Sequence, residues 1–150
     1  MCDMLEDEVG ANDRIIFENE HFIVFLPFFC EYPYGIYIAS KRHIQNLSQM
    51  TDEEKTALAQ TLKEATGTLD SLFDYPFPYM MCMYQNPVNT GEDTDFHHFH
   101  IAFYPPMRSA DKIKYCASSE TGAWAHCNPT APEEKAAELR EAHEKFLKNM

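Results

Sequence analysis

The sequence predicts an α+β domain in which an antiparallel sheet has helices packed on one face. Short runs rich in β-branched and aromatic residues are separated by turn signals, and two longer segments carry apolar residues at helical spacing. Strands grouped in hairpins, together with two helices, are typical of this class. The 150 residues are enough for one domain with a real core.

The chain begins with an acidic stretch and continues with three strands. Residues 1–13 have no hydrophobic periodicity, so we expect a loose N-terminal lead-in followed by a single domain over residues 14–150. Arg14–Phe17 and Phe22–Leu26 predict the two strands of a hairpin. Gly35–Ala39 predicts a third strand.

Two segments predict helices. Thr51–Phe73 begins with a capping box of Thr51 and Glu54 and continues as one apolar stripe, in which Gly67 is a modest weakness. Thr130–Glu133 predicts a second capping box with proline in the first helical turn. The stripe of this final helix is formed by Ala136, Leu139, Ala142, Phe146 and Leu147.

Two further strands flank a polar loop. Tyr79–Tyr84 is rich in methionine, so we predict a buried core strand with an inert Cys82. Phe99–Tyr104 predicts another buried strand, which Pro105 and Pro106 end because proline has no amide hydrogen to donate. Side chains alternate along a strand. The predicted faces are His98, His100 and Ala102 on one side, and His97, Phe99, Ile101 and Phe103 on the core side.

Composition and charge exclude several functions. The net charge of -12 argues against nucleic acid or an anionic membrane as a partner, because both favour a positive protein surface. No apolar run has the length of a membrane span, and the acidic N-terminus does not resemble a signal peptide, so we expect a cytoplasmic protein. The five cysteines are odd in number and contain no Cys-x-x-Cys pair, which indicates free thiols.

The histidines His98 and His100 are candidate metal ligands. Zinc takes three protein ligands even in a catalytic site, so His43, His126 or an acidic side chain would have to complete the set. The competing interpretation is a pair of solvated or hydrogen-bonded imidazoles at the open end of a sheet.

Basic residues form a second candidate site. Arg108, Lys112 and Lys114 are the basic cluster beside the histidines, and on an acidic protein such a cluster is a natural contact for an anion. An ordinary solvated face explains them equally well. For Lys41–His43 at the end of a strand, the same alternatives are a substrate contact and a solvated turn, and residue types alone favour the turn.

The histidine strand also carries a resemblance. The run His98-Phe-His100-Ile-Ala102 resembles the His-x-His-x-His motif of the histidine-triad (HIT) superfamily, with alanine in the third position. The longer run from His100 to Ser109 is similar to the C-terminal half of galactose-1-phosphate uridylyltransferases, which is itself HIT-like. Other segments similar to that half are Phe17–Phe22, Lys41–His43, Phe77–Met81 and Pro132–Arg140.

This resemblance implies a part of an enzyme of galactose metabolism that exchanges uridylyl between UDP-glucose and galactose-1-phosphate. The family's nucleophile lies in a His-Pro-His sequence that this chain lacks, so we expect the chain to be incomplete as an enzyme alone. The family binds zinc or iron, but only His100 matches a ligand of its second metal site. Tyr84 and Ala102 occupy two other ligand positions, so we expect no cofactor in this chain. The contacts expected for UDP-hexose or hexose-1-phosphate are Lys114, Glu120, His126 and Arg108.

Three interpretations of the function stay open. The first is a stand-alone or truncated C-terminal half that is incomplete as an enzyme by itself, with a separate chain as one possible source of the His-Pro-His half. The second is an independent HIT-type nucleotide hydrolase or transferase with His100 as the nucleophile. Against it, Glu92, Asp93 and Asp95 stand where a phosphate-binding loop is expected, and they would repel phosphate. The third is a non-catalytic binding or assembly module.

The resemblance also implies a two-fold homodimer. In the family, two HIT-like halves pack against each other, so each half has a surface shaped to be covered. The aromatic segment Leu26–Tyr34 contains two prolines that keep it from being an interior strand, so some of its rings are expected to be exposed and to form the interface.

Overall fold

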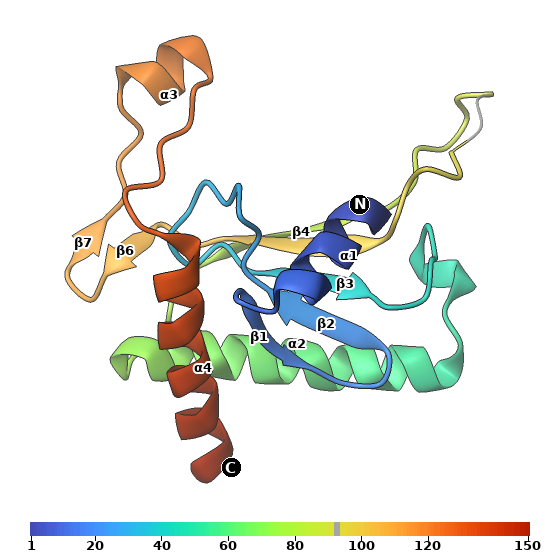
Figure 1. The fold of residues 1–150 in the computed structure, drawn as a ribbon, viewed down its shortest axis with the longest axis horizontal. Coiled ribbons are helices and arrows are strands. Elements are labelled where there is room, and N and C mark those ends of the chain that lie inside the picture. The colour runs from blue at the N-terminus through green and yellow to red at the C-terminus, as the bar shows by residue number, and fades with distance from the viewer. Residues whose placement is uncertain (92–93) are drawn as a thin grey trace.

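The computed structural model describes residues 1–91 and 94–150, and these fold around a five-stranded antiparallel sheet with packed helices (Figure 1). This confirms the predicted α+β class. The strand order across the sheet is β1 (Ile15–Glu18), β2 (Phe22–Phe25), β3 (Tyr37–Ser40), β5 (His100–Tyr104) and β4 (Met80–Tyr84). Within the described residues, no helix is long and apolar enough to cross a lipid bilayer.

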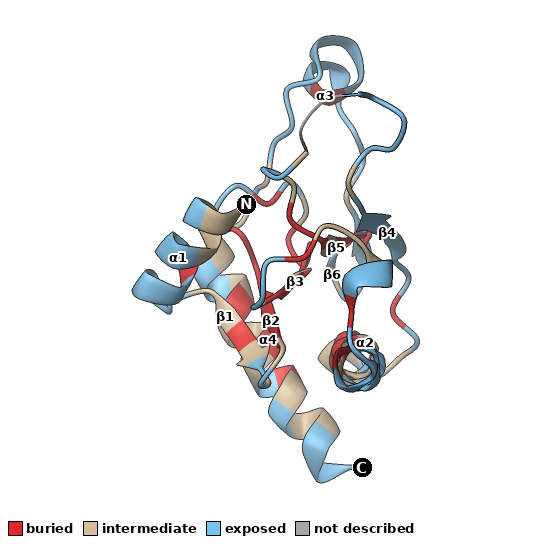
Figure 2. Cartoon of the chain, turned by 90° about the vertical axis from the view of Figure 1, so that its right-hand side faces the viewer, coloured by how far each residue is buried: buried red, intermediate tan, exposed pale blue. Residues whose placement is uncertain are grey.

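The main core lies between one face of the sheet and two helices, α2 (Asp52–Phe73) and α4 (Pro132–Lys148). Figure 2 shows the buried strands beside α2 and α4. Gly67 marks the close approach of the two helices, because a Cβ atom there would lie 2.2 Å from the ring of Phe146. The glycine that weakens α2 as a helix is therefore the residue that lets α4 pack against it.

Part of the opposite face of the sheet is covered by a helix that the sequence did not predict. Residues 1–13 were expected to be loose, but α1 (Cys2–Ala11) forms there. Met4 and Leu5 pack against the second face of the sheet, and the carboxylate of Glu8 is buried. Glu8 accepts hydrogen bonds from Arg14 Nε at 2.8 Å and from the amide of Phe28 at 3.0 Å, and these contacts fix the helix to the domain.

The methionine-rich strand β4 lies at the edge of the sheet and is exposed, contrary to the prediction of a buried core strand. It pairs with β5 alone, and all five of its residues are exposed, including Met80 and Cys82. The structure therefore also corrects the expectation of a buried Cys82. All five cysteines of the chain are free thiols, as predicted.

The predicted capping box at Thr51 is confirmed, whereas the one at Thr130 is wrong. Thr51 and Glu54 exchange side-chain and backbone hydrogen bonds at the start of α2. At the final helix the N-cap is Ala131, which makes no side-chain cap. The hydroxyl of Thr130 instead donates to the side chain of Asn128 at 2.7 Å, so it is used in the preceding turn.

Between β5 and α4 the chain leaves the body of the domain. Residues 107–128, which we call the arm, project beyond the sheet in Figure 1. The arm contains β6 (Met107–Ser109), β7 (Lys112–Ile113) and α3 (Ser118–Ala123). The remaining short element of the described chain is the 3-10 turn η1 (Leu47–Gln49).

Candidate functional site

The histidine strand divides the side chains of residues 99–103 between the two faces of the sheet as predicted, whereas the ring of His97, predicted on the core side, lies 6.2 Å from the ring of His100 between centres. Phe99, Ile101 and Phe103 belong to the main core and are fully buried. His100 pairs with Ala39 of β3, whose side chain belongs to the second face, on which α1 packs. The imidazole of His100 therefore lies on the second face of the sheet.

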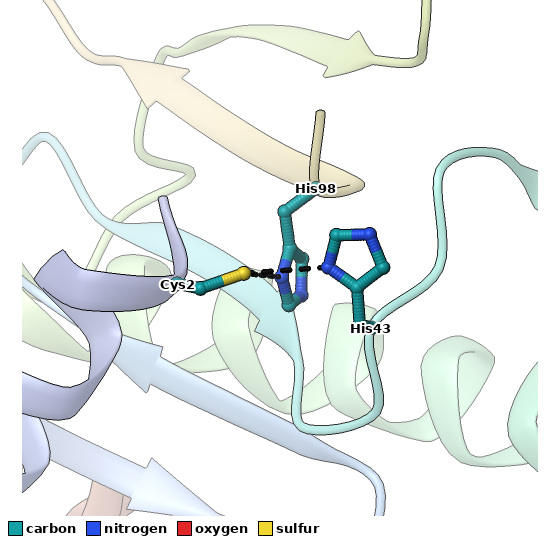
Figure 3. A group of neighbouring side chains, drawn as sticks. All are labelled: Cys2, His43 and His98. Atoms are coloured by element: carbon teal, nitrogen blue, oxygen red, sulfur yellow. Dashed lines mark hydrogen bonds between the residues drawn. The ribbon is translucent and has the colours of Figure 1, made fainter. Parts of the chain in front are cut away.

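His98 meets two other potential metal ligands on this side of the sheet. The sulfur of Cys2 lies 3.3 Å from Nδ1 of His43 and 3.3 Å from Nδ1 of His98. Figure 3 shows the three side chains pointing toward one another from α1, from the turn after β3 and from the residues before β5. We call Cys2, His43 and His98 the trio; their ligand atoms all lie within 4.8 Å of one another.

The protonation of His98 is fixed by Ser40. Nε2 of His98 lies 2.7 Å from the backbone oxygen of Ser40, which can only accept, so Nε2 carries the hydrogen. The lone pair of the neutral ring is therefore on Nδ1, the atom that faces Cys2. Burial lowers the pKa of His98, and the nearby His43 lowers it further, so the ring is held in its neutral form.

The turn that carries His43 is held by ion pairs. Lys41 lies 2.9 Å from Glu18 on β1, and Arg42 donates two hydrogen bonds of 2.7 Å to the carboxylate of Glu54. Arg42 is the main cause of the low pKa of Glu54, about 2. In the structure, Lys41 and Arg42 fix the position of the turn, and His43 is the residue of this run that joins the trio.

His100 lies apart from the trio, in a row of aromatic rings that we call the aromatic band: Phe29, Tyr37, His100 and Tyr84. Its imidazole stacks between Tyr37, at 5.7 Å, and Tyr84, at 4.7 Å between ring centres. Nδ1 of His100 donates to the backbone oxygen of His98 at 2.9 Å, which leaves the lone pair on Nε2. Burial lowers the pKa of His100 as well.

We expect no metal at the positions that the family resemblance implies for a second metal site. His100 offers one imidazole nitrogen, Ala102 offers no donor atom, and the hydroxyl of Tyr84 lies 2.6 Å from that of Tyr104. That the chain holds none there stays a prediction.

The expected substrate contacts Lys114 and Glu120 form a pair with each other. The ammonium of Lys114 contacts the carboxylate of Glu120, and only 5% and 4% of the two side chains are exposed. Glu120 also accepts from the amides of Ala117, at 2.8 Å, and Cys127, at 3.3 Å. Its pKa is lowered to about 2, chiefly by the hydrogen bond from Lys114. This buried ion pair stabilises the arm internally.

The other two expected contacts lie at the surface. Arg108 is exposed and lines a shallow hollow of the arm together with Lys112 and Tyr115. His126 lies 3.4 Å from the carboxylate of Glu31. The structure thus places Arg108, Lys114 and His126 on or at the base of one arm.

One residue of the trio was not predicted by the sequence. Cys2 stands in an acidic stretch without periodicity, and no residue near it in sequence signals a ligand.

The acidic loop that was expected to repel phosphate lies partly outside the described residues, since it includes Glu92 and Asp93. Asp95 is described; it is exposed and accepts a hydrogen bond from Gln45 at 2.9 Å.

The antiparallel sheet with its His-x-His strand defines a HIT-like domain. The same fold occurs in a zinc-bound histidine-triad family protein from Mycobacterium smegmatis, at a TM-score of 0.63 and 15% identity, with 99% of each chain covered. The family model for the C-terminal domain of galactose-1-phosphate uridyl transferase matches residues 1–146. The chain belongs to this family.

Relatives of the family are similar along most of the chain. The galactose-1-phosphate uridylyltransferase of Thermotoga maritima is 45% identical over 141 residues, which cover 94% of this chain and 44% of that protein. A solved structure of a uridylyltransferase has a TM-score of 0.86 and 34% identity, covering 96% of this chain and 44% of that one. This chain therefore spans less than half the length of either relative.

Proposed function

We propose that the chain acts as the C-terminal half of a galactose-1-phosphate uridylyltransferase and transfers uridylyl only together with a half that supplies the His-Pro-His nucleophile. The proposal rests mainly on the structure of the arm. It is braced internally by Lys114 and Glu120, yet it projects from the domain with Tyr115 81% exposed and Trp124 84% exposed. A braced segment with exposed aromatic rings is suited to contact a ligand or a second polypeptide.

The backbone at the tip of the arm supports this role. Trp124 ends α3 in the left-handed conformation, with φ of 55°, which is unusual for a bulky side chain. Helices commonly end on a residue in this conformation, which is usually glycine, and bulky residues held in it cluster at functional sites. Here the indole is directed away from the domain core, as its exposure shows.

The proposed ligands of the arm are UDP-hexose or hexose-1-phosphate. Arg108 and Lys112 are exposed cations on a protein of net charge -12, so they supply a local attraction for phosphate. His126 adds a polar group at the base of the arm. The buried pair of Lys114 and Glu120 would hold these side chains in place, and Lys114 would reach phosphate only by leaving Glu120.

A second function is favoured by one observation at His100. The hydrogen bond from its Nδ1 leaves an unprotonated Nε2, the form of imidazole that can attack phosphorus. An independent HIT-type hydrolase would form a phosphorus–nitrogen bond at this atom while the leaving phosphate departs, and water would then break that bond. The stacking of His100 between Tyr37 and Tyr84 restricts approach to the faces of the ring but not to its edge.

An assay of the isolated chain separates the two functions. Incubation with UDP-glucose and galactose-1-phosphate should give no UDP-galactose, and incubation with UDP-glucose alone should give no UMP. The matched variant is His100→Ala, and the control is His21→Ala, a histidine replacement in the turn between β1 and β2, away from the arm and the aromatic band. Turnover by the wild-type chain that disappears in His100→Ala alone would replace the proposed function with the hydrolase or transferase of His100.

A further inference from the structure

We propose that a cavity beside the base of the arm binds a small molecule through a trimethylammonium group, such as the one that choline carries. The cavity is lined by Phe29, Tyr32, Tyr37 and Tyr104, which we call the aromatic cage, and by the acidic residue Glu31. None of these residues is among the expected contacts for UDP-hexose or hexose-1-phosphate. The inference therefore goes beyond the proposed function and does not depend on it.

The rings of the aromatic cage meet in two nearly perpendicular pairs. The ring centres of Tyr32 and Tyr104 are 5.7 Å apart with their planes at 77°, and those of Phe29 and Tyr37 are 6.0 Å apart with their planes at 86°. Perpendicular rings can form adjacent walls around one ligand group, and an aromatic ring attracts a cation that comes within about 6 Å of its centre.

The size of the cavity limits the ligand to a small head group. Its volume is about 110 Å³. Pockets for drug-sized ligands measure about 300–1,000 Å³, so a nucleotide or a hexose does not fit inside the aromatic cage. A trimethylammonium group is compact and roughly spherical, and the rest of its molecule can extend into solvent.

The charge of the cavity favours a cation. Among the described residues that line it there is no lysine or arginine, whereas Glu31 contributes a carboxylate. That carboxylate lies 3.4 Å from Nδ1 of His126, and 45% of the Glu31 side chain is exposed. Histidine is positively charged only when it is protonated, so a permanently charged ligand is the better counter-ion for Glu31.

A neighbouring lysine already uses one ring of the aromatic cage in this way. Nζ of Lys114 lies 5.2 Å from the centre of the Tyr32 ring. The charge of Lys114 is paired with Glu120, only 5% of its side chain is exposed, and it does not line the cavity. Lys114 therefore shows that the Tyr32 ring accepts a cation, while the cavity stays available to a ligand.

The polar atoms of the cavity wall favour a methylated cation over a primary ammonium. The hydroxyl of Tyr104 lies 2.6 Å from that of Tyr84, and the backbone oxygen of Tyr32 accepts from the amide of Gly35 at 3.0 Å. An ammonium group has three N–H donors, and donors without partners in a closed site cost free energy. Methyl groups need no hydrogen-bond partners and pack directly against the rings.

The experiment is an NMR titration of the 150-residue chain with choline at constant ionic strength. We expect a saturable shift of the backbone amide of Gly35, which lines the cavity. The matched ligand is the neutral analogue of choline in which a tert-butyl group replaces the trimethylammonium group. It has the same shape without the charge, so it should bind at least about five-fold more weakly.

Two variants separate the contribution of the rings from that of the charge. Phe29→Leu keeps an apolar side chain but removes a ring, and Glu31→Gln keeps the shape of the side chain but removes its charge. Each should weaken choline binding by about five-fold, and Glu31→Gln should leave binding of the neutral analogue unchanged. Both positions are exposed, so the variants should fold, and circular dichroism verifies this.

The matched control is Phe96→Leu, which replaces a ring that is 76% exposed and does not line the cavity. Its affinity for choline should equal that of the wild type. The proposal is overturned if choline produces no saturable shift at Gly35, or if the neutral analogue binds as tightly as choline. A trimethyl-lysine peptide that shifts Gly35 when choline does not would also overturn it, because the ligand would then be a protein.

Discussion

At the scale of single residues, hydrogen-bond partners decide which atoms are available for chemistry. Backbone oxygens fix the ring of His98 through Nε2 and the ring of His100 through Nδ1. Two histidines two positions apart on the same face therefore present different nitrogen atoms. The sequence predicts their shared face, but it contains no information on which carbonyl oxygen each ring meets.

A prediction at this scale concerns Glu120 and acid. The folded-state pKa of Glu120 is lowered to about 2 from its ordinary value of 4.5, so its ionised form stabilises the arm above about pH 4.5, and this contribution is lost as pH falls toward 2. Amide hydrogen exchange of Ala117 and Cys127, whose N–H groups donate to Glu120, should therefore be slow at neutral pH, after correction for intrinsic rates.

The variant Glu120→Gln tests this directly. Glutamine lacks the charge that pairs with the nearly inaccessible Lys114, so both amides should exchange faster than in the wild type at every pH from 4.5 to 7. Ser119→Ala, one residue away on the exposed side of α3, is the control and should exchange as the wild type does. Equal protection in Glu120→Gln would show that the pair does not brace the arm.

At the scale of helices and strands, the pattern of apolar residues predicted the type of most elements but not always their position in the fold. The period-two alternation of β5 predicted the core face of Phe99, Ile101 and Phe103 correctly, and the stripe of α2 predicted the side of the helix that packs on the core. For β4 the same apolar composition was misleading, because only the sheet order shows that it is an edge strand. The segment that forms α1 has too few apolar residues to show a helical period in the sequence. The burial of the Glu8 carboxylate depends on hydrogen bonds from Arg14 and from the amide of Phe28.

A prediction at this scale concerns the contact of α2 with α4. Alanine in place of a helical glycine ordinarily stabilises a helix by about 1 kcal/mol. Gly67→Ala should instead destabilise this chain by about 1 kcal/mol, because its methyl group would lie 2.2 Å from the ring of Phe146 and overpacking costs about 1–3 kcal/mol. Urea unfolding measures the change in the free energy of unfolding.

The control is a double-mutant cycle with Phe146→Ala, which removes the ring. In that background, Gly67→Ala should be stabilising by up to about 1 kcal/mol, as helix propensity alone requires. If Gly67→Ala stabilises the wild-type background too, the ring of Phe146 moves aside without cost and the glycine is not needed for packing.

At the scale of the whole molecule, exposed apolar side chains indicate surfaces that a partner covers. In the segment Leu26–Tyr34, Leu26 and Tyr34 are buried, whereas Phe28 is 64% exposed and Phe29 is 45% exposed. Phe29 contacts Tyr37, so this pair of rings continues into the aromatic band. The exposed edge of β4 lies at the other end of the same band, next to His100.

We therefore expect a two-fold homodimer through this face. Light scattering on a size-exclusion peak at micromolar concentration should give a mass near twice the 17.4 kDa of the chain. Phe28→Ser should shift the mass toward the monomer, whereas Val9→Ser, which removes an exposed apolar side chain of α1, should not. A monomer mass for the wild type would contradict the prediction.

According to the proposed function, the His-Pro-His nucleophile lies in a second polypeptide half. Adding that half tests the proposed function most directly. The segment of the Thermotoga maritima relative that this chain does not match can be joined to this chain as one polypeptide. We predict that the folded hybrid forms UDP-galactose from UDP-glucose and galactose-1-phosphate, while this chain alone forms none. A folded hybrid without activity, beside an active intact relative, would contradict the account.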